Sequence, residues 1–235
     1  MTKSTQQTAV IIGAGPFISR SLSLYLASQN YAIGLISRTK SSLDKLASEI
    51  ASKHPDSKVF VHAADVGDSQ PLTSALDALK AQLGGSVTVL VYNAARVGPS
   101  ALLSLSPSEL ETDLRTSAIG TLVAGQWFSH NADAASKPLL LITGGVLDRE
   151  PNADYASLSA AKAASQCVGR MFAQTLPEKH GIRVGMPLIV EPIIPAEGGG
   201  YVTKSDPDVI VEKIFRPFFE ARERDLKEWT VERLF

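Results

Sequence analysis

The sequence predicts an α/β protein in which a doubly wound parallel sheet carries helices on both faces. Two observations support this prediction. Short apolar runs bounded by turn residues recur along the chain, and segments with helical periodicity separate them. This alternation is typical of a parallel sheet covered on both sides, which binds its ligands at the carboxyl ends of the strands.

Six apolar runs are predicted to form the buried strands. They are TAVIIG (8–13), YAIGLIS (31–37), SKVFVHA (57–63), VTVLVYN (87–93), KPLLLIT (137–143) and GIRVGMPLIV (181–190). Ser106-Pro107-Ser108-Glu109 is a capping box with proline at the first helical position, so a helix is expected to run from there toward His130. A last helix over about residues 206–224 and a short strand, EWTVERLF (228–235), are expected to close the chain.

Length and charge indicate one domain, residues 1–235, whose partner is a small molecule. A chain of 235 residues can bury about three quarters of its unfolded surface. The 23 basic and 24 acidic residues leave a net charge of −1, which favours neither nucleic acid nor a membrane surface as a partner. Residues 1–7 are polar and expected to be flexible, and without a signal-like or long apolar segment we expect a soluble, cytoplasmic protein.

Neither the cysteine nor the histidines suggest chemistry. Cys167 lies in a helical pattern and is expected to be a small buried hydrophobic residue. The four histidines are scattered without metal-ligand spacing, so no metal site is expected.

A glycine-containing turn follows the first strand and opens the first helix. In GAGPFIS, Gly13 and Gly15 allow close backbone approach, and the peptide groups at Phe17 and Ile18 begin the helix. Backbone amides at such a turn can hold a pyrophosphate. A tight turn without a ligand remains the alternative.

The end of the second strand favours a phosphorylated cofactor. Ser37 and Arg38 lie where a cofactor without a 2′-phosphate usually requires an acidic residue, and a guanidinium instead suits that phosphate. If a dinucleotide binds, we therefore expect NADP(H), with Lys40 as a weaker second charge. The alternative is a pair of solvated basic residues at a helix start.

These features together resemble the short-chain dehydrogenase/reductase family over nearly the whole chain. The turn at Gly13 is joined by Asp65-Val66 after the third strand, Tyr92-Asn93-Ala94-Ala95 after the fourth, and Lys162 on the helix after the fifth. The resemblance implies a Rossmann-type fold, a homodimer or homotetramer, and a cofactor lined by Asp65, Val66, Asn93 and Ala94. It implies that Lys162 holds the nicotinamide ribose.

The catalytic positions of the family are mostly changed in this sequence. Leu158 stands four residues before Lys162, where the family has its tyrosine acid. Gly145 replaces the serine that binds the substrate oxygen, and Ser117 replaces the asparagine that supports a proton relay. The resemblance therefore implies an atypical member that lacks the catalytic tyrosine, serine and asparagine.

The phosphate turn departs from the family as well. Phe17 and Ser19 occupy the positions of its second and third glycines, and the Phe17 ring is expected to narrow the pyrophosphate path.

Several polar residues remain as candidate site residues. Tyr155 lies seven residues before Lys162, about 10 Å along a helix, with Asp154 as the expected N-cap. The others follow sheet strands and could act as an acid, a base or an anion ligand: Arg96, Asp148, Arg149 and Glu191. Residues 191–205 are rich in proline and glycine and are expected to form a mobile substrate loop.

Three functions are compatible with these features. The first is NADPH-linked reduction of a small imine, enone or carbonyl compound without the tyrosine acid. The second is a non-redox isomerase, cyclase or dehydratase on the same fold, which would act through Arg96, Asp148 or Glu191. The third is a catalytically silent binding or dimer-partner protein, since the helices that carry Ser117 and Lys162 are rich in small residues.

Overall fold

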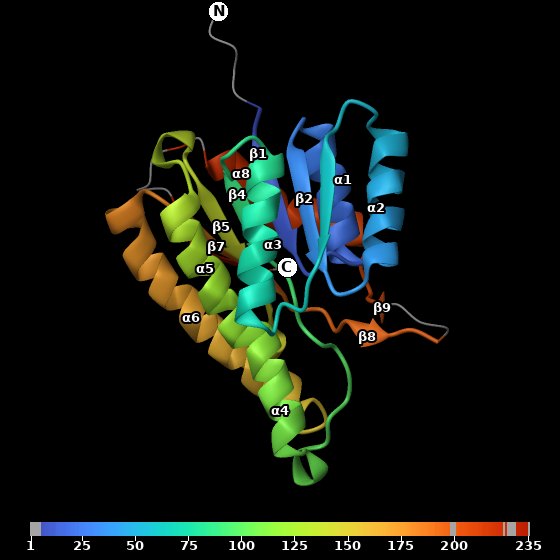
Figure 1. The fold of residues 1–235 in the computed structure, drawn as a ribbon. Helices are drawn as coiled ribbons and strands as arrows, with labels where there is room; N and C mark the ends of the chain where they lie inside the picture. Colours follow the sequence, from blue (N-terminus) through green and yellow to red (C-terminus); the bar gives the residue numbers. More distant parts are fainter. Residues whose placement is uncertain (1–5, 198–200, 223, 225–228, 235) are drawn as a thin grey trace, which may run out of the picture.

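A central, mostly parallel sheet organises the computed structural model, which describes residues 6–197, 201–222, 224 and 229–234 (Figure 1). Its strand order is β10-β7-β5-β4-β1-β2-β3, and each neighbouring pair in this order is parallel. The strands are β1 (Thr8–Ile12), β2 (Ala32–Ser37), β3 (Val59–Ala63), β4 (Val89–Tyr92), β5 (Leu139–Ile142), β7 (Arg183–Ile189) and β10 (Glu232–Leu234). The order reverses at β1, so the predicted doubly wound parallel sheet is confirmed.

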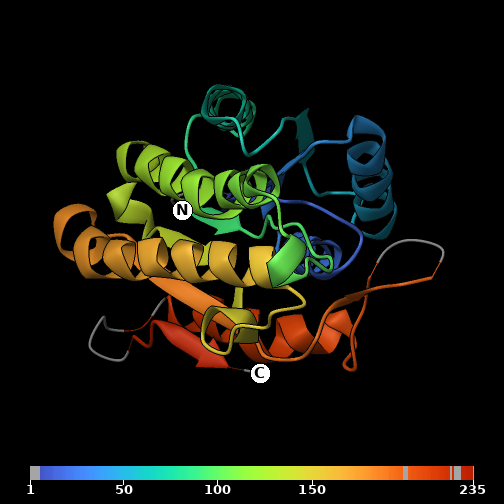
Figure 2. The ribbon, with the colours of Figure 1, turned by 90° about the horizontal axis from the view of Figure 1, so that it is seen from below.

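Helices cover both faces of this sheet, as predicted. They are α1 (Ile18–Ser28), α2 (Lys40–Lys53), α3 (Ser69–Gln82), α4 (Pro107–Leu114), α5 (Gly120–Asn131), α6 (Ala156–His180), α7 (Pro207–Ile210) and α8 (Arg216–Ala221). One apolar cluster joins α1, α2 and α8 to one face, and a second joins α3, α5 and α6 to the other. Figure 2 shows α5 and α6 side by side on the latter face.

The central strands are largely apolar because both of their sides are covered. Along β1, Ala9 and Ile11 belong to one cluster, Val10 and Ile12 belong to the other, and all four are 0% exposed. Burying one such aliphatic side chain contributes about 1.5–3 kcal/mol, so a strand without polar interruptions is favoured at the centre of the sheet.

The predicted helix toward His130 is confirmed and contains a wider turn. Ser106 Oγ accepts a hydrogen bond from Glu109 N at 3.2 Å, and Pro107 occupies the first turn. After α4 the helix passes through a π-helical turn, Arg115–Ile119, and continues as α5 to Asn131. The Glu109 carboxylate binds Arg96 and does not complete the capping box.

The segments at the chain ends are partly as expected. The predicted last helix consists of α7, a π-helical turn (Val211–Phe215) and α8, and the short strand is β10. Residues 1–5 of the expected flexible N-terminus lie outside the described residues. Gln7, at its other end, is hydrogen-bonded by Ala32 N and by Arg222 Nη2.

The expected substrate loop, residues 191–205, contains a small antiparallel hairpin. Its strands are β8 (Ile194–Pro195) and β9 (Tyr201–Val202), and residues 198–200 lie outside the described residues.

The prediction for Cys167 is wrong, because this side chain is exposed on α6 while its neighbour Gln166 is buried. Among the helices that the structure describes, none is long and apolar enough to cross a membrane.

Candidate active site

A cavity of about 730 Å³ lies at the carboxyl ends of β1, β4, β5 and β7. Its walls come from the turn between β1 and α1, from the segments after β4, β5 and β7, from the first turns of α6, and from Tyr201 of β9. This is the edge at which the sequence predicted a ligand, since parallel strands bring their following loops together there.

The turn between β1 and α1 contains two glycines with different surroundings. The backbone requires glycine at Gly13, whereas the space beside Gly15 is open. Gly13 has φ +84°, and a Cβ on it would lie 2.6 Å from Cα and N of Ala94. A Cβ on Gly15 would meet nothing within 4 Å, and Gly15 lines the cavity. Phe17 is the N-cap of α1 and gives no side-chain cap, so the first amides of this helix have no side-chain acceptor there. The open space beside the Gly15 backbone and the N–H groups in the first turn of α1 are suited to an anion such as a pyrophosphate.

Ser19 and Asn93 brace this turn against β4. Ser19 Oγ donates a hydrogen bond to Gly13 O at 2.8 Å, and Asn93 Nδ2 donates to Ser19 Oγ at 2.8 Å. Ser19, which stands at a glycine position of the family, therefore joins the two strand ends that line the cavity.

Phe17 lines the cavity beside the hairpin. Its ring lies 6.5 Å from that of Tyr201 between centroids, and it also packs on the apolar cluster under α1. The residue therefore links the phosphate turn to the hairpin after β7.

The residues expected to hold the adenosine end lie along the same sheet edge but outside the cavity. Arg38 is exposed and, among the described residues, makes no ion pair, while Lys40 pairs with Asp44. Asp65 is exposed and its Oδ1 accepts a hydrogen bond from Gly67 N at 2.9 Å. Of the expected cofactor residues, the cavity is lined by Gly13, Gly15, Phe17, Ile18, Asn93 and Lys162, and not by Ser37, Arg38, Asp65, Val66 or Ala94.

Lys162 reaches the cavity from α6. Its Nζ donates a hydrogen bond to Thr143 O at 2.9 Å. Burial lowers the pKa of this ammonium to about 8, although the nearby Asp148 carboxylate acts in the opposite direction. Leu158, one turn earlier on α6, and Gly145 line the same cavity. Leu158 and Gly145 thus line the same cavity as Lys162, and neither offers a hydroxyl.

Ser117 is placed differently. It lies in the π-helical turn before α5, outside the cavity, and its buried Oγ has no hydrogen-bond partner among the described residues. Its carbonyl oxygen accepts from Thr121 Oγ1, which also contacts Ser165 Oγ on α6 at 3.0 Å.

Tyr155 lines the cavity at the start of α6, where it is the N-cap residue. The prediction that Asp154 caps this helix is wrong. Ser100, which follows β4, takes that role, because its Oγ accepts from Ser157 N at 3.0 Å and its carbonyl accepts from Ala156 N at 3.0 Å. The loop after β4 therefore fixes the start of α6.

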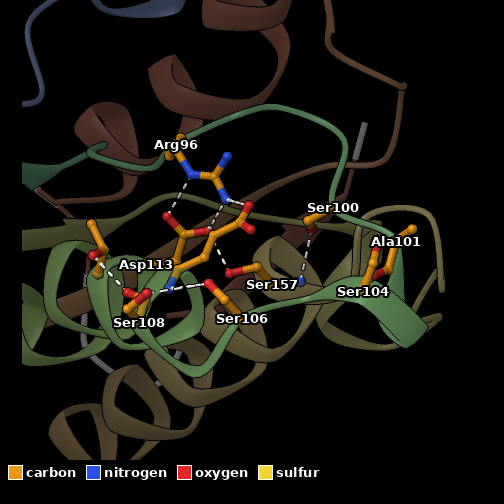
Figure 3. A network of polar contacts seen from close by, with 10 residues as sticks. Arg96, Ser100, Ala101, Ser104, Ser106, Ser108, Asp113 and Ser157 are labelled. Carbon is orange, nitrogen blue, oxygen red and sulfur yellow. Dashed lines mark hydrogen bonds and ion pairs between the residues drawn. The ribbon is translucent and has the colours of Figure 1, made fainter.

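Arg96 belongs to a polar network beside the cavity (Figure 3). Its Nε and Nη2 donate to the two oxygens of Asp113 at 2.8 and 2.7 Å, and Nη2 also binds Glu109. Asp113 is buried and accepts from Ser157 Oγ at 2.6 Å. Arg96 does not line the cavity. Its guanidinium group, which was expected to hold a substrate anion, is instead bound by two protein carboxylates.

The acidic candidates after β5 and β7 differ in their environments. The Asp148 side chain is 0% exposed and neither oxygen accepts a hydrogen bond from the described residues, so burial raises its pKa. Arg149 Nε lies 3.9 Å from Asp148 Oδ2, and its guanidinium also binds Glu232. Glu191 lines the cavity and accepts from Ser205 N and Oγ and from Thr203 Oγ1, which lowers its pKa.

Sequence reasoning missed several residues of the cavity wall. Glu150 and Asn152 line it although they were not singled out, whereas Ile193, Ile194 and Tyr201 belong to the substrate loop predicted over residues 191–205. The first two come from a loop without a motif, so only their position after a sheet strand could have indicated them.

Comparison with known proteins gives one family. The chain matches the family model described as short chain dehydrogenase over residues 7–190. A very-long-chain 3-oxoacyl-CoA reductase of Aspergillus terreus is 32% identical over 161 residues, which are 67% of this chain and 45% of the relative. The chain spans about half the length of the first curated relatives it matches.

Solved structures share the fold. A short-chain dehydrogenase from Rhodopseudomonas palustris has a TM-score of 0.80 at 17% identity, with 97% of each chain covered. An alcohol dehydrogenase from Thermococcus sibiricus, complexed with 5-hydroxy-NADP, has a TM-score of 0.80 at 22% identity and covers 97% of this chain and 95% of its own.

Proposed function

The chain belongs to the short-chain dehydrogenase family, and from this membership we propose that it is an NADP(H)-linked oxidoreductase of atypical catalysis. One observation carries the proposal. The phosphate turn at Gly15 and the ammonium of Lys162 line one continuous cavity at the carboxyl edge of the sheet. A dinucleotide that extends from that turn would bring its nicotinamide end toward Lys162.

The residues present fit such a cofactor. Gly15 leaves open space at the backbone, and the N-terminus of α1 offers amides to a pyrophosphate. Arg38, exposed at the end of β2, is suited to a 2′-phosphate because its planar guanidinium binds phosphate oxygens in pairs. When bound, NADPH would supply a hydride.

The substrate proposed is a small, largely apolar compound with an imine, enone or carbonyl group. Apolar side chains of Val97, Val146, Leu158, Ile193 and Ile194 form much of the cavity wall. Hydride addition to an iminium or to the alkene of an enone requires no proton on the atom that is attacked, so Leu158 is compatible with such chemistry.

A non-redox reaction is the second candidate. Leu158 and Gly145 place no hydroxyl beside Lys162, whereas Glu150, Glu191 and Tyr155 give the same cavity groups for acid–base chemistry. The proposed function and this alternative differ in whether NADPH is consumed.

We also propose that the protein is a homodimer or homotetramer. Ile119, Leu122 and Met171 are exposed apolar side chains on the adjacent segments before α5, on α5 and on α6. Sedimentation velocity at micromolar concentration is expected to give at least a dimer, and a monomer would contradict this.

Calorimetric titration with NADPH and NADH tests the cofactor assignment. Micromolar binding of NADPH, weaker binding of NADH, and an at least tenfold loss for NADPH in Arg38→Ala are expected, since a hydrogen-bonded charge contributes about 1.5–3 kcal/mol. Lys40→Ala is the matched control, because Lys40 already pairs with Asp44. No NADPH binding at millimolar concentration would contradict the proposal.

A further inference from the structure

Asp148 carries a buried carboxylate whose contacts do not offset the cost of removing it from water. Its side chain is 0% exposed, and neither oxygen has a hydrogen-bond partner among the described residues. The nearest ion-pair contact is Arg149 Nε at 3.9 Å. A buried charge without hydrogen bonds is strongly destabilising unless other charges compensate it, so the cations around Asp148 determine its state.

Lys162 is one of those cations, because the short turn that carries Asp148 (Val146–Asp148) packs against α6, and it also faces the cavity. Of the described residues that line the cavity, it is the only one with a cationic side chain. Only one of its three N–H donors is accounted for, by Thr143 O at 2.9 Å. The attraction between Asp148 and Lys162 favours the protonated form of the lysine.

Buried polar side chains lie close to Lys162, on α6 and in the segment after β5. Gln166, one turn after Lys162 on α6, is 0% exposed, and both ends of its amide lack a hydrogen-bond partner among the described residues. Thr143 Oγ1 is also buried without such a partner. A Cβ on Gly144 would lie 2.3 Å from Gln166 Nε2, so the segment after β5 is packed closely against this face of α6. Buried polar atoms of this kind usually have a partner, so Gln166 and Thr143 leave hydrogen-bonding capacity beside Lys162.

We propose that Lys162 is the proton donor that replaces the missing tyrosine, and that Asp148 is the positioning residue that keeps it protonated. The inference rests on the proposed function and narrows its substrate to a compound whose carbonyl oxygen becomes an alcohol or enol. When bound NADPH supplies a hydride to the carbonyl carbon, or to the β-carbon of an enone, Lys162 would give up a proton, so that one N–H bond at Nζ breaks. An O–H bond forms on the substrate oxygen, the electron pair stays on the amine, and water returns a proton to Nζ.

Other titratable groups around the pair are already engaged or lie on the cavity wall. Arg149 and Arg170 both bind Glu232 of β10. Asp113 of α4, which packs against the start of α6, is bound by Arg96 and by Ser157. On the cavity wall, Glu191 is held by Ser205 and Thr203, and the remaining titratable side chains are Glu150, Tyr155 and Tyr201.

Near-neutral titration of Lys162 is measurable without cofactor or substrate. Trace acetylation with acetic anhydride at a series of pH values, followed by mass spectrometry of the peptide that carries residue 162, reports the free amine fraction. We expect a midpoint near pH 8 in the wild type and a lower midpoint in Asp148→Asn, because the opposing carboxylate is gone. Asp154→Asn, an exposed carboxylate outside the cavity, is the matched control and should leave the midpoint unchanged. An unchanged midpoint in Asp148→Asn overturns the role of Asp148.

The proton-donor role is tested by the pH dependence of NADPH oxidation with 2-cyclohexen-1-one and ethyl 3-oxobutanoate as probes. The alkaline limb of kcat/KM is expected near pH 8 in the wild type, at lower pH in Asp148→Asn and unchanged in Asp154→Asn. Lys162→Arg keeps the positive charge, so NADPH binding should remain within about threefold while kcat falls at least 100-fold, because a guanidinium does not release its proton below about pH 12.

The outcomes separate this inference from the proposed function. Two results would overturn the proton-donor role alone. One is a pH profile of kcat/KM whose alkaline limb is the same in the wild type and Asp148→Asn, and the other is turnover retained in Lys162→Arg. Failure to bind NADPH overturns the proposed function, and an absence of wild-type turnover with both carbonyl probes overturns the proton-donor role as well.

Discussion

Leu158 and Lys162 lie one helical turn apart on α6 and line the same cavity, so an aliphatic side chain and an ammonium share one wall. Leucine offers no proton. Lys162, in contrast, carries a positive charge and donates a hydrogen bond to Thr143 O, and the buried carboxylate of Asp148 attracts it.

Restoring the hydroxyl should increase carbonyl reduction. In Leu158→Tyr a phenol would lie one turn from the ammonium, and a positioned general acid contributes about 10²–10⁴-fold. We expect NADPH oxidation with ethyl 3-oxobutanoate to rise at least tenfold. Leu158→Phe is the matched control for ring size, and an equal rate in the two variants would contradict the prediction.

The two glycines of the phosphate turn should respond differently to the same change. Gly13→Ala is expected to destabilise the protein by more than about 2 kcal/mol, since φ is +84° and the new Cβ would meet Ala94 at 2.6 Å. Gly15→Ala should keep its stability within about 1 kcal/mol but lose NADPH affinity at least tenfold, because its methyl group would occupy the anion side of the turn. Thermal unfolding and calorimetry measure the two effects, and unchanged NADPH affinity in Gly15→Ala would argue against a pyrophosphate there.

Burial of Lys162 should make stability depend on pH. Its pKa falls from 10.5 to about 8 on folding, so the unfolded chain binds more protons between these values and the free energy of unfolding rises with pH across that window. The destabilisation is fully present below pH 8 and is relieved by pH 10.5, which corresponds to about 3 kcal/mol. Urea unfolding should show this rise in the wild type relative to Lys162→Met, and parallel pH profiles would contradict it.

Asp113 should matter more for stability than an exposed acidic residue on the same helix. Asp113→Asn weakens the bonds to Arg96 and removes a buried countercharge, at an expected cost of about 1–3 kcal/mol. Glu111→Gln removes only an exposed pair with Arg115 and should cost less than about 0.5 kcal/mol. Chemical denaturation compares the two variants, and equal losses would show that the network contributes no more than a surface pair.

The sheet was predictable because its strands carry their own signals. β5 is apolar at every position and β1 at every position after Thr8, which requires cover on both faces and leaves few alternatives to a parallel sheet. Ser106 and Pro107 likewise marked the start of α4 through local chemistry.

Tertiary contacts decided what the sequence pattern could not. Ser100 caps α6 from 55 or more residues away, so the local choice of Asp154 failed. α6 packs on β7 on one side and against α4 and α5 on another, so periodicity did not indicate that Cys167 faces outward. Arg96 finds Asp113 through the fold of the loop after β4, and this pairing removes it from the cavity wall.

The central claim is that this cavity transfers hydride from NADPH, and isotope transfer tests it most directly. The wild-type protein would be incubated with NADPH deuterated at the transferred position of C4 and with 2-cyclohexen-1-one and ethyl 3-oxobutanoate, and the products analysed by mass spectrometry. One deuterium on the reduced carbon, formed at least several-fold more slowly in Gly15→Ala when NADPH is below saturation, is the predicted result. Unlabelled products, or NADPH that remains fully reduced with both probes, would contradict the account and favour non-redox chemistry in the same cavity.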